Sequence, residues 1–476
     1  MAIAADASRR SWASARVLVL VALGTVSSFA HAASLTELWE RIATTEPSLL
    51  SGLAQARATA ERVNQAKAEF YPRVALTANK TRNWRRYETL GEEPTTTRDR
   101  YNSDGFQLTA TQPLWKPVIE HGHKQALANK EQSYFQFETT RQDLLLRLIT
   151  AWAEDLDGRD AIRAAQAVEE AAEVHSKAHT QGFALGLFSR DQRDESQAKY
   201  QQAIADRYTA ESDWFAKHGQ LEQLVGPLAP TNQDYLTLDL NKLPFSAVSY
   251  TAVTEQLDTL NPAIRAAQFA WLAAQAEVKK QEAEYQPVVE LVASTGRNNQ
   301  PDTGPTPSQA GFRSRVSSIA IQLNWPLYSG GSTTSKVREA RHMVEKARQD
   351  METARRNAHN QASQGWAQLR SARAKLEAAR QRVVAAKTFE QAAVEGRKNN
   401  VKSFYDEVYA RQLLESAYRE ARRAYYDNVI GFSKLKAALG ELDEDTLLEI
   451  QQNLKNPQVS EPVPRIVFPN VDARGG

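Results

Sequence analysis

The sequence contains no cysteine among its 476 residues. This excludes disulfide bonds, thiolate metal sites, cysteine nucleophiles and lipid attachment through a cysteine. The sequence also lacks an excess of charge of either sign, because 59 Lys and Arg stand against 57 Asp and Glu. A nucleic-acid-binding protein normally has a clear basic excess, so we expect no nucleic-acid partner.

Motifs of catalysis and cofactor binding are absent as well. The sequence has no G-x-x-x-x-G-K-[ST], no G-x-S-x-G and no H-E-x-x-H. His175 and His179 have the i, i+4 spacing of a helical metal pair but no third ligand nearby, so we interpret them as surface residues. The aspartates of residues 155–160 lack the EF-hand spacing. We therefore expect no enzyme activity, no cofactor and no metal.

The one apolar run of note lies at the N-terminus. Residues 17–29 (VLVLVALGTVSSF) follow three arginines and precede Ala30-His31-Ala32, which fits a small-x-small cleavage site. A run of 13 residues is too short to span a bilayer, which needs about 20. We predict that residues 1–32 are a signal peptide and that no helix of the mature chain crosses a membrane.

The sequence is internally duplicated, because landmarks recur about 214 positions apart. They are Glu46-Pro47 and Asn261-Pro262, Tyr71-Pro72 and Gln286-Pro287, Gln112 to Trp115 and Trp325 to Tyr328, Gly182 and Gly396, and Gly226 and Gly440. We predict two structural repeats over residues 33–226 and 250–440. A linker over residues 227–249 joins them, and residues 441–476 form a C-terminal periplasmic tail.

Each repeat is expected to have the same order of elements. A helix of about 35 residues (35–70 or 250–285) ends at a proline, which cannot continue a helix. Two strands follow, and then a long helical hairpin over residues 117–226 or 331–440. Breaks at residues 182–189 and 399–403 turn each hairpin at an exposed tip.

The long helix of the second repeat shows a heptad-like seam of small and apolar residues. The seam consists of Val337, Ala340, Val344, Ala347, Met351, Ala354, Ala358, Ala362, Gly365, Leu369, Ala372, Leu376, Ala379, Val383 and Ala386. Its steps of three and four residues, with one stutter after Ala354, predict a nearly straight rod packed against other rods. Alanine in the seam lets neighbouring backbones approach closely.

Four segments have the period of a strand: 73–82, 105–113, 288–297 and 314–325. Apolar residues alternate with weakly polar ones, which is typical of transmembrane β-strands. Tyr71, Trp115 and Trp325 lie at segment ends, where an aromatic girdle is expected. The polar segments 83–104 and 298–311 are then exposed loops. Four strands cannot close a barrel, so several copies must combine. A small soluble sheet is the alternative.

Three motifs carry a resemblance to a known family. They are Trp325-Pro326-Leu327-Tyr328-Ser329-Gly330-Gly331, Phe183 to Leu187 followed by Ser189, and Leu435 to Gly440. With the duplication, they resemble the TolC-like outer-membrane efflux and secretion channels over residues 35–440. The resemblance implies a mainly α fold with a membrane β-barrel: a homotrimer whose 12-stranded barrel continues as a periplasmic α-helical barrel.

The resemblance also implies a function and partners. The trimer in the outer membrane lipid would be the exit duct of a type I secretion system or a tripartite efflux pump. Its partners would be a periplasmic adaptor protein and an inner-membrane ABC or RND transporter. A periplasmic adaptor and a coiled-coil structural protein of the envelope are the alternative functions.

Family members have acidic residues near the hairpin tips that narrow the periplasmic entrance. Asp406 matches such an aspartate, whereas the next acidic position is Tyr409 here. In the first repeat the match falls on Gln192, between Asp191 and Asp194, and Lys402 stands where a basic residue is expected. We hypothesise that Lys402 pairs with Asp191 or Asp194 when the entrance is closed. The alternative is a solvated charged tip.

Overall fold

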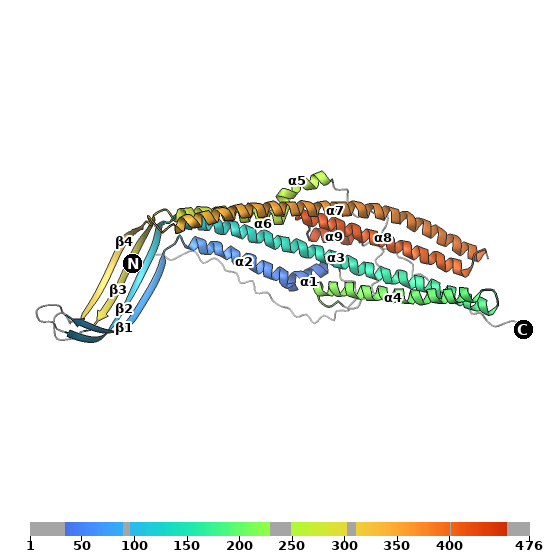
Figure 1. The fold of residues 1–476 in the computed structure, drawn as a ribbon, viewed down its shortest axis with the longest axis horizontal. Coiled ribbons are helices and arrows are strands. Elements are labelled where there is room, and N and C mark those ends of the chain that lie inside the picture. The colour runs from blue at the N-terminus through green and yellow to red at the C-terminus, as the bar shows by residue number, and fades with distance from the viewer. Residues whose placement is uncertain (1–33, 89–95, 229–248, 302–310, 400, 455–476) are drawn as a thin grey trace, which may run out of the picture.

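The computed structural model describes residues 34–88, 96–228, 249–301, 311–399 and 401–454. The predicted signal peptide, most of the predicted linker and the end of the predicted tail lie outside the described residues. The molecule is elongated, with a β-sheet at one end and long helices that run from it to the opposite end (Figure 1).

The two halves of the chain have the same order of elements. The first half contains α1 (Leu35–Thr45), α2 (Pro47–Ala68), β1 (Arg73–Glu88), β2 (Thr96–Trp115), α3 (Pro117–Ala184) and α4 (Arg190–Val225). The second half contains α5 (Tyr250–Leu260), α6 (Pro262–Ala283), β3 (Val288–Gln300), β4 (Phe312–Asn324), α7 (Ser332–Lys398) and α8 (Phe404–Leu439). A last helix, α9 (Glu444–Leu454), follows α8.

The prediction of one helix of about 35 residues at the start of each half is wrong. Pro47 and Pro262 each begin a second helix, and the residue before each is extended, with ψ of 116° at Glu46 and 121° at Asn261. A proline disfavours the helical conformation of the residue that precedes it. The Asn261 side chain then caps the new helix by accepting a hydrogen bond from the Ile264 N–H at 2.9 Å.

The four strands form one antiparallel sheet in the order β1-β2-β3-β4. Its first hairpin is longer than the sequence predicted, because the pairing continues from Arg82↔Asn102 to Glu88↔Thr96. The prediction of a loop over residues 83–104 is therefore wrong for most of that segment. Threonine, tyrosine and tryptophan favour strands even where their neighbours are polar, so polarity alone did not indicate a loop.

The strand register separates two faces of the sheet. Pairs such as Leu76↔Leu108 and Leu291↔Ile321 put the apolar residues on one face, which we call the apolar band. Its large members on β1, β2 and β4 are between 41% and 79% exposed: Val74, Leu76, Phe106, Leu108, Ile319, Ile321 and Leu323. The opposite face carries small and polar residues, such as Thr77 opposite Gln107. None of the described helices is both long enough and apolar enough to cross a membrane.

The predicted seam of α7 is confirmed as its packing face. Ten of its 15 residues are buried and the other five are half-buried. The helices come closest where glycine replaces a side chain. A Cβ on Gly431 of α8 would lie 2.9 Å from the Leu369 amide nitrogen and 3.0 Å from its Cα. Gly431 thus lets the backbones of α7 and α8 touch.

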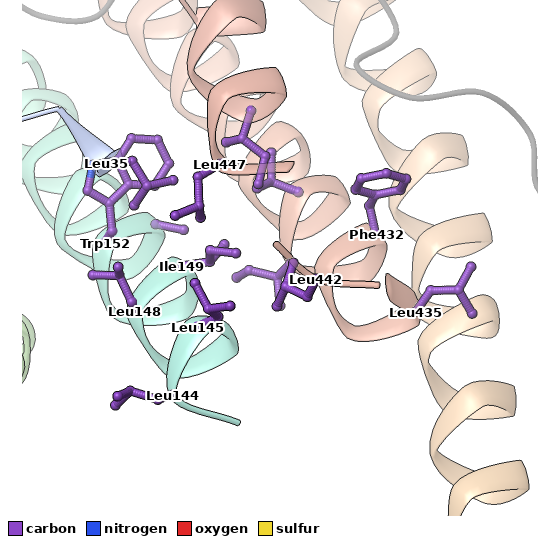
Figure 2. Packing of buried hydrophobic residues seen from close by; sticks show 14 of the residues in the cluster. Leu35, Leu144, Leu145, Leu148, Ile149, Trp152, Phe432, Leu435, Leu442 and Leu447 are labelled. Atoms are coloured by element: carbon purple, nitrogen blue, oxygen red, sulfur yellow. The ribbon is translucent and has the colours of Figure 1, made fainter. Parts of the chain in front are cut away.

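The main apolar cluster lies midway along the helices (Figure 2). Leucine and isoleucine side chains of α3, including Leu145, Leu148 and Ile149, meet Leu442 and Leu447 beyond the end of α8. All five are fully buried. The predicted tail therefore begins with a packed segment, because α9 belongs to this core. As predicted, glycines end α4 and α8: Gly226 and Gly440 have φ of 79° and 73°.

Gly431→Ala should lower the thermal unfolding midpoint measured by circular dichroism. Its methyl group would press against the α7 backbone, which cannot rotate away, and overpacking of this kind costs about 1–3 kcal/mol. Gly219→Ala is the matched control, because a Cβ there meets nothing within 4 Å. That substitution should raise the midpoint slightly, since alanine favours a helix by about 1 kcal/mol over glycine. Equal midpoints for the two variants would contradict the close approach.

Candidate functional site

The tips of the two hairpins lie at the end of the molecule that is remote from the sheet (Figure 1). Both tips have the same turn, with residues 214 positions apart. The Leu187 N–H donates to the Gly182 carbonyl at 2.8 Å, and the Val401 N–H donates to the Gly396 carbonyl at 2.8 Å. Each glycine makes room for a side chain of the tip. Phe188 packs on Gly182, and the stem of Lys402 packs on Gly396.

Both tips end in a capping box that starts the returning helix. Ser189 and Gln192 cap α4, and Ser403 and Asp406 cap α8. The Asp406 carboxylate accepts hydrogen bonds from the Ser403 hydroxyl at 2.7 Å and from its N–H at 2.8 Å. These hydrogen bonds lower the pKa of Asp406. The predicted entrance residue Asp406 thus holds a helix end, and the capping box uses only its Oδ2 atom.

The two tips share a turn but differ in chemistry. In the first tip the Arg193 guanidinium lies over the Phe183 ring, 4.5 Å from its centroid. In the second tip the equivalent positions hold Arg397 and Glu407, which form an ion pair at 2.6 Å. At this pair of positions the first tip thus has a cation–π contact and the second an ion pair, while Arg397 also lies over the Phe404 ring at 4.5 Å.

The structure places the residues of the predicted clasp on separate tips. Asp194 pairs with Arg193 at 2.6 Å and with Arg190 at 3.6 Å. Among the described residues of this single chain, Lys402 makes no ion pair with Asp194 or with Asp191, which lies in the first turn of α4. The clasp stays a prediction about the assembled entrance.

Tyr409 lies one turn beyond the cap of α8 and is 41% exposed. Its ring stacks on Tyr405, and Tyr405 in turn contacts His175 of α3, with ring centroids 4.5 Å apart. His175 also lies against His179, whose ring stacks on Phe188. Both histidines are half-exposed, which agrees with a surface position, but their rings also join the first tip to the start of α8.

The pKa of His175 reflects this packing. Burial lowers it, and the neighbouring His179 and Lys199 lower it further against the opposing effect of Glu195. Packing beside His179 and Tyr405 thus disfavours the charged form of the His175 imidazole. One usable signal is present in the sequence, the i, i+4 spacing, but Tyr405 comes from an element far away in the chain.

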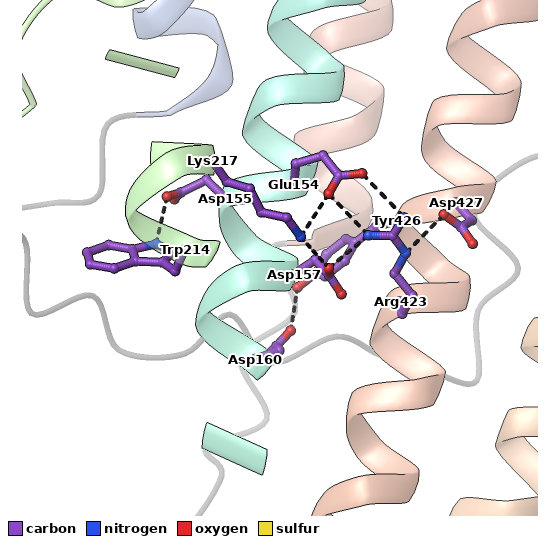
Figure 3. Close-up of polar contacts among 9 residues, drawn as sticks. All are labelled: Glu154, Asp155, Asp157, Asp160, Trp214, Lys217, Arg423, Tyr426 and Asp427. Carbon is purple, nitrogen blue, oxygen red and sulfur yellow. Dashed lines mark hydrogen bonds and ion pairs between the residues drawn. The ribbon is translucent and has the colours of Figure 1, made fainter. Parts of the chain in front are cut away.

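A second polar site lies midway along the hairpins (Figure 3). Lys217 of α4 and Arg423 of α8 both bind Asp157 of α3, at 2.9 and 2.8 Å. Both also bind Glu154, at 3.0 and 3.2 Å. Burial would raise the pKa of Glu154, but hydrogen bonds from Lys217 and Arg423 outweigh it, so the pKa is lowered. Two cations from two helices thus share two carboxylates.

Two further aspartates of α3 extend this network. Asp155 accepts a hydrogen bond from the Trp214 indole at 2.9 Å, and His218 lies at the same distance from it. Asp160 pairs with Arg422 at 2.8 Å and accepts the Tyr426 hydroxyl at 2.9 Å. Burial raises the pKa of Asp160 despite these partners. The aspartates that the sequence showed without an EF-hand spacing therefore bind α3 to α4 and α8.

Comparison with known proteins gives the family context. The sequence profile of the family described as "Outer membrane efflux protein" matches residues 38–227 and 253–441, well over half of the chain. The alkaline protease secretion protein AprF of Pseudomonas aeruginosa is 28% identical over 389 residues, covering 81% of this chain and 80% of AprF. The outer membrane protein TolC of Escherichia coli is 23% identical, covering 94% of this chain and 90% of TolC.

Solved structures show the same fold. The outer membrane protein VceC of Vibrio cholerae superposes with a TM-score of 0.68 at 16% identity, covering 86% of this chain and 97% of VceC. Its likeness concerns the fold alone, whereas the profile match covers both halves of the sequence. The protein is located in the outer membrane, and the chain belongs to the outer membrane efflux protein family.

Proposed function

We propose that three copies of this chain form a duct that starts as a 12-stranded β-barrel in the outer membrane and continues as a tunnel of helices into the periplasm. The duct is the outer-membrane exit of a type I secretion system or a tripartite efflux pump. The observation that carries the proposal is an open sheet, apolar on one face and polar on the other, at one end of long helical hairpins.

The need for several copies follows from the sheet edges. Among the strands that the structure describes, β1 and β4 each have a neighbour on one side only. Unpaired backbone N–H and C=O groups cannot remain in lipid, because each costs several kcal/mol. Pairing β1 of one copy with β4 of the next satisfies both edges, and four strands per copy are too few to close a barrel alone. The number three comes from the resemblance to the TolC-like channels.

The two faces of the sheet fit this arrangement. The apolar band would face lipid, and the small polar residues of the other face would line the duct. Trp115 and Trp325, both 55% exposed, lie at the helical end of the sheet, where an aromatic girdle contacts the membrane interface. The long helices then extend the wall of the duct away from the membrane.

The hairpin tips would form the periplasmic entrance, with Asp406 and Tyr409 towards its centre. We propose that Lys402 reaches Asp191 or Asp194 of an adjacent hairpin when the entrance is closed. The network around Asp157 holds α3, α4 and α8 together farther from the tips, so it would anchor the hairpins while their tips move. An adaptor protein and an inner-membrane ABC or RND transporter would supply cargo and energy.

The alternative functions lose support. A plain coiled-coil protein would have no sheet, whereas this chain has four paired strands. The matching family is described as outer membrane efflux proteins and VceC as an outer membrane protein, which gives no support to a periplasmic adaptor.

Disulfide trapping tests whether β1 of one copy pairs with β4 of the next. No native cysteine can form a competing disulfide, since the chain has none. Thr77→Cys on β1 is combined in turn with Ser314→Cys, Val316→Cys or Ser318→Cys on β4, which covers the neighbouring registers. Oxidised membranes should give dimers and trimers on non-reducing gels, and no larger species. Gln107→Cys with Ser318→Cys is the control, because β3 separates β2 from β4. Monomers alone in every register would refute the closed assembly.

Removing the Lys402 charge tests the entrance clasp. Lys402→Met keeps the stem on Gly396 and should raise single-channel conductance at low salt, with a smaller difference at high salt. Each exposed pair contributes only about 0–1 kcal/mol, so we expect an increase of a few-fold from three copies. Lys398→Met is the control, because Lys398 pairs with Glu395 at 2.7 Å within its own helix. Unchanged conductance of Lys402→Met would discard the clasp.

Arg423→Met tests the network that anchors the hairpins. It leaves Asp157, which is almost fully buried, with Lys217 as its cation. Breaking a buried pair costs about 3–5 kcal/mol, but Arg423 is 41% exposed, so we expect about 1–2 kcal/mol and a lower thermal midpoint. Arg382→Met is the control, since its exposed pair with Glu420 should contribute at most about 1 kcal/mol. Equal shifts would show that the network has no special role.

A further inference from the structure

The apolar face of the sheet continues into a group of basic residues at the end remote from the helices. We call six of them the arginine belt: Arg82, Arg86, Arg98, Arg100, Arg297 and Arg315. All lie on β1–β4, and all are exposed except Arg297, which is half-buried. Lys80 and Arg313 lie on the same face, whereas Glu88 and Asp104 are the acidic residues there. The charge of this face is strongly positive.

The strand register places the belt directly beside the apolar band. On β1, even-numbered residues share a face, so Val74, Leu76 and Ala78 are followed by Lys80 and Arg82. On the neighbouring strands, Phe106 of the band lies opposite Arg297, and Arg297 lies opposite Arg315. The row of paired residues that contains Phe106, Arg297 and Arg315 crosses β2, β3 and β4 and is the boundary between the apolar band and the arginine belt.

Two belt pairs put like charges directly opposite each other: Arg86↔Arg98 and Arg297↔Arg315. Directly opposed residues have Cβ atoms about 4.5–5.5 Å apart, and like charges there destabilise a sheet. Within the described ranges, none of these four arginines forms an ion pair with a carboxylate, and Asp104 accepts a hydrogen bond from Asn299 instead. Anions from outside the chain would relieve the repulsion.

We propose that the arginine belt binds the phosphate groups of anionic lipids at the outer surface of the membrane. This inference rests on the proposed function, because it needs the apolar band to lie in lipid. Head groups are then the first polar groups that meet the face beyond the band. The guanidinium fork binds phosphate through two parallel hydrogen bonds, so one phosphate between two opposed arginines neutralises both.

The surroundings of the belt fit a lipid head group better than a free anion. Trp84 lies on the same face, 66% exposed, with the Arg82 guanidinium 5.5 Å from its ring centroid. Tryptophan is enriched at membrane interfaces, where its ring lies among head groups. The belt is also continuous with an apolar surface that acyl chains would cover. A free phosphate would bind the arginines but would make no apolar contact with the band.

Native mass spectrometry of the assembled channel in detergent tests the proposal. The probes are lipid A, dephosphorylated lipid A and inorganic phosphate. Lipid A should bind at least tenfold more tightly than its dephosphorylated form, and millimolar inorganic phosphate should not displace it. A variant with Arg86, Arg98, Arg297 and Arg315 all changed to Ser should lose at least tenfold of that affinity. The corresponding Lys variant should retain part of it.

A matched control removes four exposed basic residues of α7, which begins at the end of the sheet opposite the belt: Arg338, Lys346, Lys375 and Lys387. Its lipid A affinity should stay within twofold of the unmodified channel. If the fourfold Ser variant does not assemble, Arg297→Ser with Arg315→Ser alone should still lower the affinity several-fold. Equal binding of the phosphorylated and dephosphorylated lipid, or displacement by inorganic phosphate, would overturn the inference.

The outcome separates this inference from the proposed function. Both the unmodified channel and the Ser variant should insert into phosphatidylcholine vesicles and conduct ions, because the band and the sheet edges are unchanged. An inserted, conducting channel that does not distinguish the lipids overturns the lipid site alone. A chain that never inserts overturns both.

Discussion

Backbone hydrogen bonding at the two outer strands is the constraint on which the assembly depends. Among the described strands, β1 and β4 each pair on one side, and the large residues of the apolar band on β1, β2 and β4 are exposed. Neither feature is stable in a single copy in water. Closing the sheet with other copies would satisfy the backbone, and lipid would cover the band. The helices would then surround the same axis, because α2, α3, α6 and α7 each begin or end within eight residues of a strand end.

The helical part is held together by two kinds of contact. Where α7 and α8 approach closely, small residues such as Gly365 and Gly431 allow backbone contact and dense packing. Midway along α3, buried carboxylates instead bind cations from α4 and α8. Two helices that pack through an apolar seam can shift past each other by one turn and still bury apolar residues. Charged partners specify a single register of the two helices. Rods of this length need the second kind of contact to fix their relative positions.

Much of the fold could be predicted from the sequence, because it depends on local patterns. The seam of α7 follows a three-and-four spacing that only a helix places on one face, and Gly226 and Gly440 are helix-ending residues. The prolines at residues 47 and 262 mark the helix breaks, but a helical pattern continues on both sides of them. The strand ends at Glu88 and Thr96 lie in a polar segment, for which polarity alone predicts a loop.

The sites were predicted less well, because their partners are distant in sequence. The i, i+4 spacing of His175 and His179 did not reveal Tyr405, more than 200 residues away. The aspartates of α3 gave no sign of Arg423 or Lys217. Asp406 was identified by position, but its role as a helix cap depends on the Ser403 side chain. A pattern along one helix or strand predicts that element, whereas contacts between elements can be identified only when the fold is known.

The equivalent turns of the two tips have a consequence for the response of the rim to ionic strength. Each tip carries an ion pair of one arginine, Arg193 with Asp194 in the first and Arg397 with Glu407 in the second. The same two guanidinium groups lie over the rings of Phe183 and Phe404. Dissolved ions screen the ion pairs, whereas the backbone hydrogen bonds of the two turns are nearly unaffected. Around a ring of identical subunits, every tip would then loosen at high salt while keeping its turn.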